Sequence, residues 1–96
     1  MTKTVWGTVS GNGDLLAGAG CTISKQGTGI YVIDFTTSFS GVPALVGSQT
    51  GFGSQGQSPL DNVAFPFLTG GTATAVTGDN QGSKEDRQFS FIAIGN

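Results

Sequence analysis

The sequence has no histidine, a single cysteine and very few charged residues. Charged side chains make up 10% of the 96 residues, against about 25% in an average globular protein. The net charge is −2, and the only cations are Lys3, Lys25, Lys84 and Arg87. Because a nucleic-acid-binding protein needs a basic patch to neutralise phosphates, the composition argues against nucleic acid as a partner.

The missing histidine and the lone cysteine also argue against an enzyme. Histidine is the commonest general base, and no serine here has a base near it in the sequence. Cys21 has no second cysteine to form an internal disulfide with. Its small, uncharged neighbours indicate a core residue rather than a reactive thiolate. We therefore expect no enzymatic activity and no cofactor.

Long apolar runs are absent as well. No stretch approaches the ~20 residues of a membrane span, so we expect no membrane insertion, and residues 1–20 do not resemble a secretion signal. A cytoplasmic start, removal of a signal and excision from a longer chain all stay open. The length predicts one domain over residues 1–96. Such a chain buries only roughly 60–65% of its unfolded surface, so its size and low charge favour an oligomer.

Short runs of β-branched and aromatic residues, separated by glycine-rich turns, predict an all-β protein. No segment has the apolar period and the caps of a helix. Residues 25–29 are expected as a turn and residues 38–43 as a corner, with Pro43 at a strand start or an edge. The expected strands are residues 4–10, 21–24, 30–35, 44–47, 63–67, 72–77 and 89–94, and residues 15–17 would add an eighth. This pattern is typical of a small antiparallel β-sandwich or barrel.

The strand at residues 30–35 is apolar on both faces. Because side chains alternate along a strand, Tyr31, Ile33 and Phe35 share one face, and Ile30 and Val32 share the other. We interpret the first face as core and the second as a surface that another subunit covers. Two phenylalanine-rich strands complete the expected core, through Val63, Phe65, Phe67, Phe89 and Phe91.

Two polar loops carry the candidate ligand-binding residues. Residues 50–61 form a Gly/Ser/Gln loop that is long for a compact domain, and such loops are often functional. Residues 78–87 form a second loop with a cluster of charges. Amides and carboxylates can orient sugar hydroxyls while an aromatic ring stacks on the apolar sugar face. The predicted ligand-binding residues are Phe52, Gln55, Gln57, Asp61, Asn62, Asp79, Asn80, Asp86 and Arg87.

Each of these features also has a plain structural explanation. For the charged cluster we favour a solvated loop that keeps a neutral protein soluble, and the other loop would equally serve as an ordinary flexible connection. Oxygens within residues 79–86 suit calcium, but their spacing matches no calcium loop, so we expect no metal. Trp6 is either a sugar platform or, because it lies beside Val5 in the first strand, an interface or core anchor.

The pattern GTGIYVIDFTTSFSGVP, followed about fifty residues later by FSFIAIG, resembles a β-domain at the C-termini of phage tail fibres and bacterial secreted proteins. Over residues 7–95 it is also distantly similar to the H-type lectin domain. The resemblance implies a six- to eight-stranded sandwich, jelly-roll or H-type-lectin-like, that assembles as a trimer or a dimer of trimers. It also implies glycan binding by loops and an extracellular or virion-associated location. Residues 83–88 lack the aromatic or histidine side chains that H-type lectins carry there.

Two classes of function follow. The first is a carbohydrate-binding module, either a lectin or a receptor-binding tip, which binds a cell-surface saccharide as a multivalent homo-oligomer. The second is a structural protein without a small ligand, either a trimerising fibre cap or a self-assembling filament subunit. We favour the first class because the polar loops are larger than folding requires.

Overall fold

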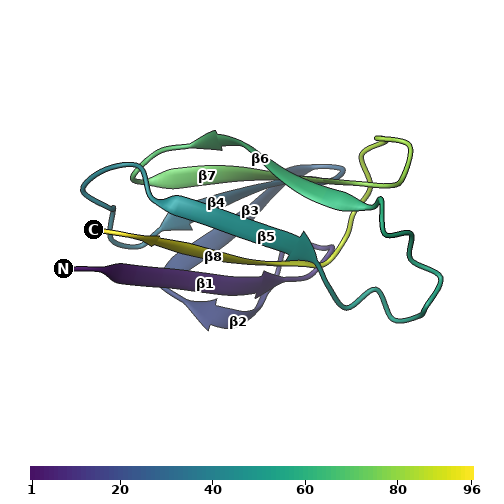
Figure 1. The fold of residues 1–96 in the computed structure, drawn as a ribbon, viewed down its shortest axis with the longest axis horizontal. Helices are drawn as coiled ribbons and strands as arrows, with labels where there is room; N and C mark the ends of the chain where they lie inside the picture. Colours follow the sequence, from purple (N-terminus) through teal and green to yellow (C-terminus); the bar gives the residue numbers. More distant parts are fainter.

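The computed structural model describes all 96 residues, which form eight antiparallel strands and no helix (Figure 1). The strands are β1 (Lys3–Val9), β2 (Leu15–Ala19), β3 (Cys21–Gly27), β4 (Ile30–Phe35), β5 (Ala44–Gln49), β6 (Asn62–Leu68), β7 (Thr72–Gly78) and β8 (Phe89–Gly95). The prediction of an all-β chain is confirmed, and β2 is the eighth strand. The structure contains no helix of the length and apolar character that a membrane span requires.

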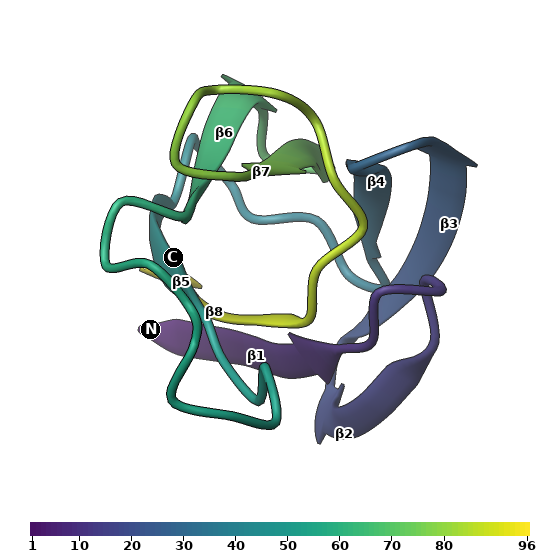
Figure 2. The same ribbon diagram turned by 90° about the vertical axis from the view of Figure 1, so that its right-hand side faces the viewer.

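The strands form two four-stranded sheets that face each other across the core (Figures 1 and 2). The strand order is β2-β1-β8-β5 in the first sheet, which we call sheet A, and β3-β4-β7-β6 in the second, which we call sheet B. The last strand, β8, returns to sheet A and lies between β1 and β5. The predicted small antiparallel sandwich is confirmed at this level.

The two predicted loops lie at one end of an elongated molecule, whose extents are 41 × 22 × 21 Å. The β5–β6 connection (residues 50–61), which we call the long loop, and the β7–β8 connection (79–88), which we call the charged loop, both extend from the end opposite the two termini (Figure 1). The tight β1–β2 and β3–β4 turns lie at the same end as these loops (Figure 1). The sandwich therefore places its two candidate ligand-binding loops on one tip.

Aromatic side chains from both sheets fill the core. Phe89 of sheet A has its ring centroid 5.2 Å from that of Tyr31 in sheet B and 6.4 Å from that of Phe91. The buried Tyr31 hydroxyl donates a hydrogen bond to the carbonyl of Gly11, at 2.8 Å, which satisfies its one polar group. The predicted core is confirmed at Tyr31, Ile33, Phe35, Val63, Phe89 and Phe91, and Phe65 packs half-buried against it.

The prediction that Phe67 belongs to this core is wrong. Strand β6 pairs regularly with β7 up to Ala64, and the pairing resumes at Phe67, so that two residues of β6 oppose one of β7. Such a bulge shifts the alternation by one residue. It turns Phe67 outward, with 53% of its surface exposed, and turns Leu68 towards the core. Pro66, which has no N–H to donate to the ladder, lies inside the bulge.

The β3–β4 hairpin also differs from the prediction. Strand β3 continues through Lys25 to Gly27, with an irregular register, and the turn is reduced to Thr28 and Gly29. Gly29 adopts a φ of 67°, a conformation that glycine accepts without steric cost. The turn is therefore tighter than the polar run at residues 25–29 indicates.

The outer face of β4 is less open than the sequence indicates. Ile30 and Val32 are already half-buried in the single chain, and the charged Asp34 shares their face. The part of this face on β4 therefore presents little apolar surface, and its coverage by another subunit stays a prediction.

Cys21 is a buried, free cysteine at the start of β3. Burial raises the pKa of its thiol, because the thiolate would lose hydration there. The interpretation of Cys21 as a structural core residue is confirmed.

Candidate ligand-binding loops

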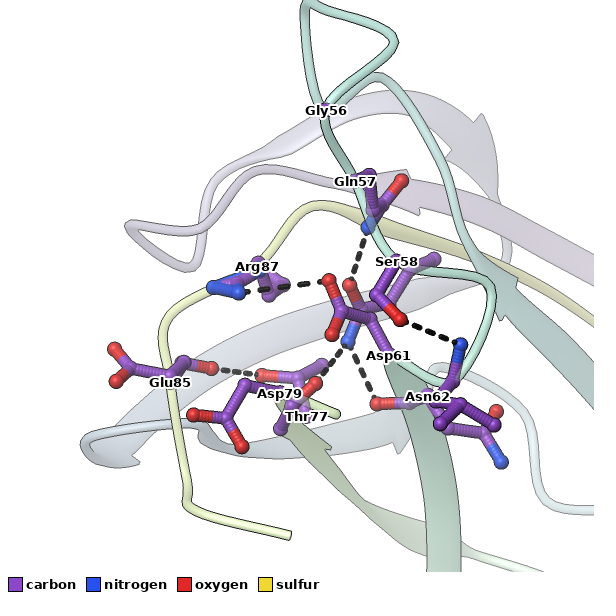
Figure 3. Close-up of polar contacts among 12 residues, drawn as sticks. Gly56, Gln57, Ser58, Asp61, Asn62, Thr77, Asp79, Glu85 and Arg87 are labelled. Carbon is purple, nitrogen blue, oxygen red and sulfur yellow. Dashed lines mark hydrogen bonds and ion pairs between the residues drawn. The ribbon is translucent and has the colours of Figure 1, made fainter. Parts of the chain in front are cut away.

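An ion pair joins the long loop to the charged loop. A terminal nitrogen of Arg87 lies 3.6 Å from a carboxylate oxygen of Asp61 (Figure 3). Only 19% of the Arg87 side chain and 5% of the Asp61 side chain are exposed. The guanidinium also lies over the ring of Phe52, 5.3 Å from its centroid, within the range of a cation–π contact. We call these three residues the clamp.

The clamp is better suited to holding the loops than to contacting a ligand. Exposed ion pairs contribute little to stability, but separating this shielded pair would leave the Asp61 carboxylate without its partner. The carboxylate is almost inaccessible, so a ligand could not reach it without opening the loops. Asp61 and Arg87 therefore act as positioning residues in any site built from these loops.

Gln49, the last residue of β5, ties the base of the long loop to β6 and β7 of the opposite sheet. Its side-chain nitrogen donates to the carbonyl of Asn62, at 2.7 Å, and to that of Gly78, at 2.8 Å. Its side-chain oxygen accepts a hydrogen bond from Gln57, at 2.7 Å (Figure 3). Sequence reasoning missed Gln49; the only available signal was a polar residue ending an apolar strand, directly before a long loop.

Asp79 organises the first part of the charged loop. One of its carboxylate oxygens accepts hydrogen bonds from the backbone amides of Gln81, at 2.9 Å, and Ser83, at 3.0 Å. These two bonds hold the pKa of Asp79 below its ordinary value, because they stabilise the carboxylate form. Asp79 is thus ionised at neutral pH, and its second oxygen has no hydrogen-bond partner in the protein.

Asp86 points away from the clamp and towards the β3–β4 turn. It accepts a hydrogen bond from the backbone N–H of Gly29, at 2.8 Å, and forms an ion pair of 3.2 Å with Lys25. The Gly29 bond first, and then Lys25, lower the pKa of Asp86. The role of this carboxylate is to hold the charged loop against the turn.

The lowered pKa of Asp86 leads to a pH-dependence. A carboxyl with a lower pKa in the folded than in the unfolded state stabilises the fold above its unfolded pKa, about 4. That stabilisation is lost as the pH falls through the lower, folded value. We expect the melting temperature to decline below about pH 4 and the decline to be shallower in Asp86→Asn. Thermal melts between pH 5 and 2 measure this, with Asp14→Asn as the control; equal slopes in Asp86→Asn and the parent would contradict the assignment.

A shallow hollow of about 390 Å³ lies where β6 begins and β7 ends. Three of the predicted site residues line it, namely Asn62, Asp79 and Asn80. Lys84 and Leu60 line it as well, and Leu60 is 70% exposed. The sequence does not identify Lys84 and Leu60 as site residues, because only the folded loops bring them close to β6 and β7. The hollow thus combines charged, amide and apolar groups.

The remaining predicted residues lie outside both the clamp and the hollow. Gln57 is engaged with Gln49, and Asp86 is engaged with Lys25. Gln55 is exposed and makes no hydrogen bond to the protein. The side chains do not gather into a group of three or more metal-ligating residues.

Comparisons with protein-family models, with curated proteins and with solved structures find no match to this chain.

Proposed function

We propose that the protein is a carbohydrate-binding module, a lectin or receptor-binding tip, which acts as a multivalent homo-oligomer. The hollow beside β6 and β7 supports this proposal most directly, because it places amide and carboxylate groups next to exposed apolar side chains. A saccharide presents both hydroxyl groups and an apolar ring face, and sites that bind such ligands combine the two kinds of group.

The polar groups of the hollow have unused hydrogen-bonding capacity. The side-chain nitrogen of Asn62 has no partner in the protein, since only its oxygen is engaged, by the N–H of Val63. The free oxygen of Asp79 can accept from a sugar hydroxyl in a charge-assisted bond. Lys84 offers donors, and Leu60 offers an apolar surface against which a sugar ring can lie.

The clamp and Gln49 have supporting roles in this proposal. They fix the ends of the two loops, so less loop entropy is lost when a ligand binds. A single shallow site of this kind binds weakly, and several copies on one oligomer raise the avidity for a cell-surface saccharide. The same proposal includes assembly as a trimer or a dimer of trimers, an H-type-lectin-like topology and an extracellular or virion-associated location. These three parts depend on the resemblance of the sequence to phage tail-fibre and H-type lectin domains.

We expect Asn80→Ala and Asp79→Asn to weaken sugar binding several-fold, up to about tenfold each, because a lost hydrogen bond costs about 0.5–1.5 kcal/mol. Asp79→Asn keeps an oxygen for the two backbone amides, so the loop is retained. Gln55→Ala is the matched control, because Gln55 is an exposed amide outside the hollow. The measurement is a broad glycan array, followed by titration of the best sugar. The site is misplaced if Gln55→Ala loses binding and the hollow variants keep it.

A structural subunit without a small ligand is the second candidate, and the exposed apolar side chains on the outer face of sheet A favour it, namely Trp6, Val46, Ile92 and Ile94. A parent protein that binds no sugar on the array and assembles in an open, concentration-dependent way would support a filament subunit. A parent that binds no sugar and forms a closed oligomer would support a fibre cap.

A further inference from the structure

The outer face of sheet A carries a row of large apolar side chains that the core does not use. Trp6 of β1 and Val46 of β5 both lie directly opposite Ile92 of the central strand β8. Their exposed fractions are 44%, 69% and 51%, in that order. Ile94, the next outward residue of β8, is 45% exposed. Three neighbouring strands thus present one continuous apolar surface.

Most of the rest of this face is small or hydroxylated, and none of it is charged. Thr8, Ser90 and Ser48 form the next row, with Thr8 and Ser90 hydrogen-bonded at 2.9 Å. On β2 the residues opposite Trp6 and Thr8 are alanines, and Leu16, at the register shift, is 57% exposed. Between the two rows lies an open hollow of about 470 Å³, floored in part by Gly7 and Gly47. All ten charged residues of the chain lie elsewhere.

The outer face of sheet B is different. It contains Asp34, and its β-branched residues Val32 and Val76 are half-buried in the single chain. Threonines occupy much of β7 on that side. Phe67, on the edge strand β6, is the one large apolar side chain that this face exposes, at 53%. The apolar side chains of sheet A therefore form a cluster on an uncharged face, whereas sheet B carries a charge and a single exposed aromatic residue.

We infer that the outer face of β2-β1-β8-β5, in place of the outer face of β4 that the sequence pattern indicates, is the surface through which copies of this chain pack on one another. This rests on the homo-oligomer of the proposed function and names the surface that holds it together; it does not depend on sugar binding. An uncharged face can meet a copy of itself or a neighbouring subunit without burying an unpaired charge. Flat pleated faces pack about 10 Å apart through interdigitating side chains.

The size of the face fits this role. Four strands spaced ~4.8 Å apart and about six residues long, at ~3.3 Å per residue, cover roughly 400 Å² of flat area. Two copies thus contribute roughly 800 Å², and the relief of their side chains brings the accessible area towards ~1,000 Å², the lower limit for a specific interface. A stacked sugar on Trp6 would need far less area and would leave Ile94 and Val46 exposed.

The first test is Val46→Lys, because Val46 is 69% exposed on an edge strand and a lysine there can reach water in the free subunit. We expect light scattering at tens of micromolar to show an oligomer for the parent and a 9.7 kDa species for the variant, with the same far-ultraviolet circular dichroism. Phe67→Lys is the matched control, since Phe67 is an outward, 53% exposed residue on the edge strand of sheet B; it should keep the parent mass. A monomeric parent, or an unchanged mass in Val46→Lys, overturns the inference.

The second test uses Trp6, the only tryptophan, as a reporter on the face itself. On dilution of the unmodified protein we expect its fluorescence to shift to longer wavelength as the oligomer dissociates and the ring meets water. Val46→Lys should show the shifted emission at every concentration. Emission in the parent that is independent of concentration across the mass transition places the contact elsewhere and overturns the inference.

Failure of this inference can be told apart from failure of sugar binding. If the inference holds, Val46→Lys binds an immobilised glycan with the single-site affinity and loses only avidity. If Trp6 is instead a sugar platform, soluble sugar shifts its emission while the mass of the parent stays that of a monomer. If a different protein covers the face, the parent is monomeric and sugar leaves Trp6 unchanged. The last two results overturn the inference.

Discussion

Replacing Phe89 by alanine is expected to lower the free energy of unfolding by roughly 3–5 kcal/mol, which is comparable to the whole stability of a small domain. Phe89 is fully buried, and its ring meets Tyr31, Phe65 and Phe91 at centroid distances of 5.2, 6.5 and 6.4 Å. It is thus the point at which aromatic side chains of sheets A and B meet. Alanine would remove these contacts and leave a cavity between two sheets that cannot close completely.

Thermal unfolding measures this effect, because each kcal/mol shifts the melting temperature of a domain this size by about 4–8 °C. We expect a fall of at least ~12 °C, or insoluble protein, for Phe89→Ala. Phe67→Ala is the matched control, since it makes the same chemical change at a side chain that is 53% exposed. Both variants are compared at equal protein concentration, because an oligomer melts in a concentration-dependent way. Equal melting temperatures for the two variants would show that Phe89 is not central to the core.

Most of the strands and the core could be predicted from local pattern alone. Tyr31, Ile33 and Phe35 alternate along one short run, and Phe89 and Phe91 along another. A period of two is enough to identify their shared face, and buried aromatic residues dominate a small core. The structure places all five in the core.

The outward orientation of Phe67 is a feature that the local alternation of side chains does not predict. The alternation through β6 is regular in sequence, but the register between β6 and β7 shifts after Ala64. A bulge depends on how two strands pair, and the pairing partner lies in a different segment. Pro66 indicates an irregularity, yet it does not indicate on which side of it the face changes.

The candidate site and the apolar face could be predicted only in part, because each is assembled from distant segments. The sequence indicates that residues 50–61 and 78–87 are polar loops, but it does not show that Asp61 pairs with Arg87. Likewise Trp6, Val46 and Ile92 are unremarkable in their own strands. They become one surface only because β8 lies between β1 and β5, an order that no single-strand pattern contains.

Gly29→Ala is expected to be the most damaging substitution among the turns, and it tests how the charged loop is attached to the sandwich. Gly29 is buried in the β3–β4 turn with a φ of 67°. A Cβ there would lie 2.6 Å from the carbonyl oxygen of Thr77 and 3.0 Å from that of Glu85. Both obstacles are backbone atoms, so neither can rotate away. The carbonyl of Gly29 also accepts a hydrogen bond from the N–H of Thr77, at 2.8 Å.

Gly82→Ala separates the two causes of the stability loss expected in Gly29→Ala, which are the left-handed backbone conformation and the steric overlap of the new Cβ. Gly82 has a φ of 82° in the same charged loop, and an added Cβ would meet nothing within 4 Å. It should therefore show only the backbone penalty of a left-handed residue, roughly 1–2 kcal/mol. Gly29→Ala adds to that penalty the steric overlap of its Cβ with the carbonyl oxygens of Thr77 and Glu85. Denaturant unfolding should therefore show a clearly larger loss of unfolding free energy for Gly29→Ala than for Gly82→Ala. We also expect Gly29→Ala to free the charged loop, seen as faster amide exchange at residues 84–87, because the bond from the Gly29 N–H to Asp86 cannot survive the displacement. Equal losses for the two variants would show that the turn and the charged loop are not in contact.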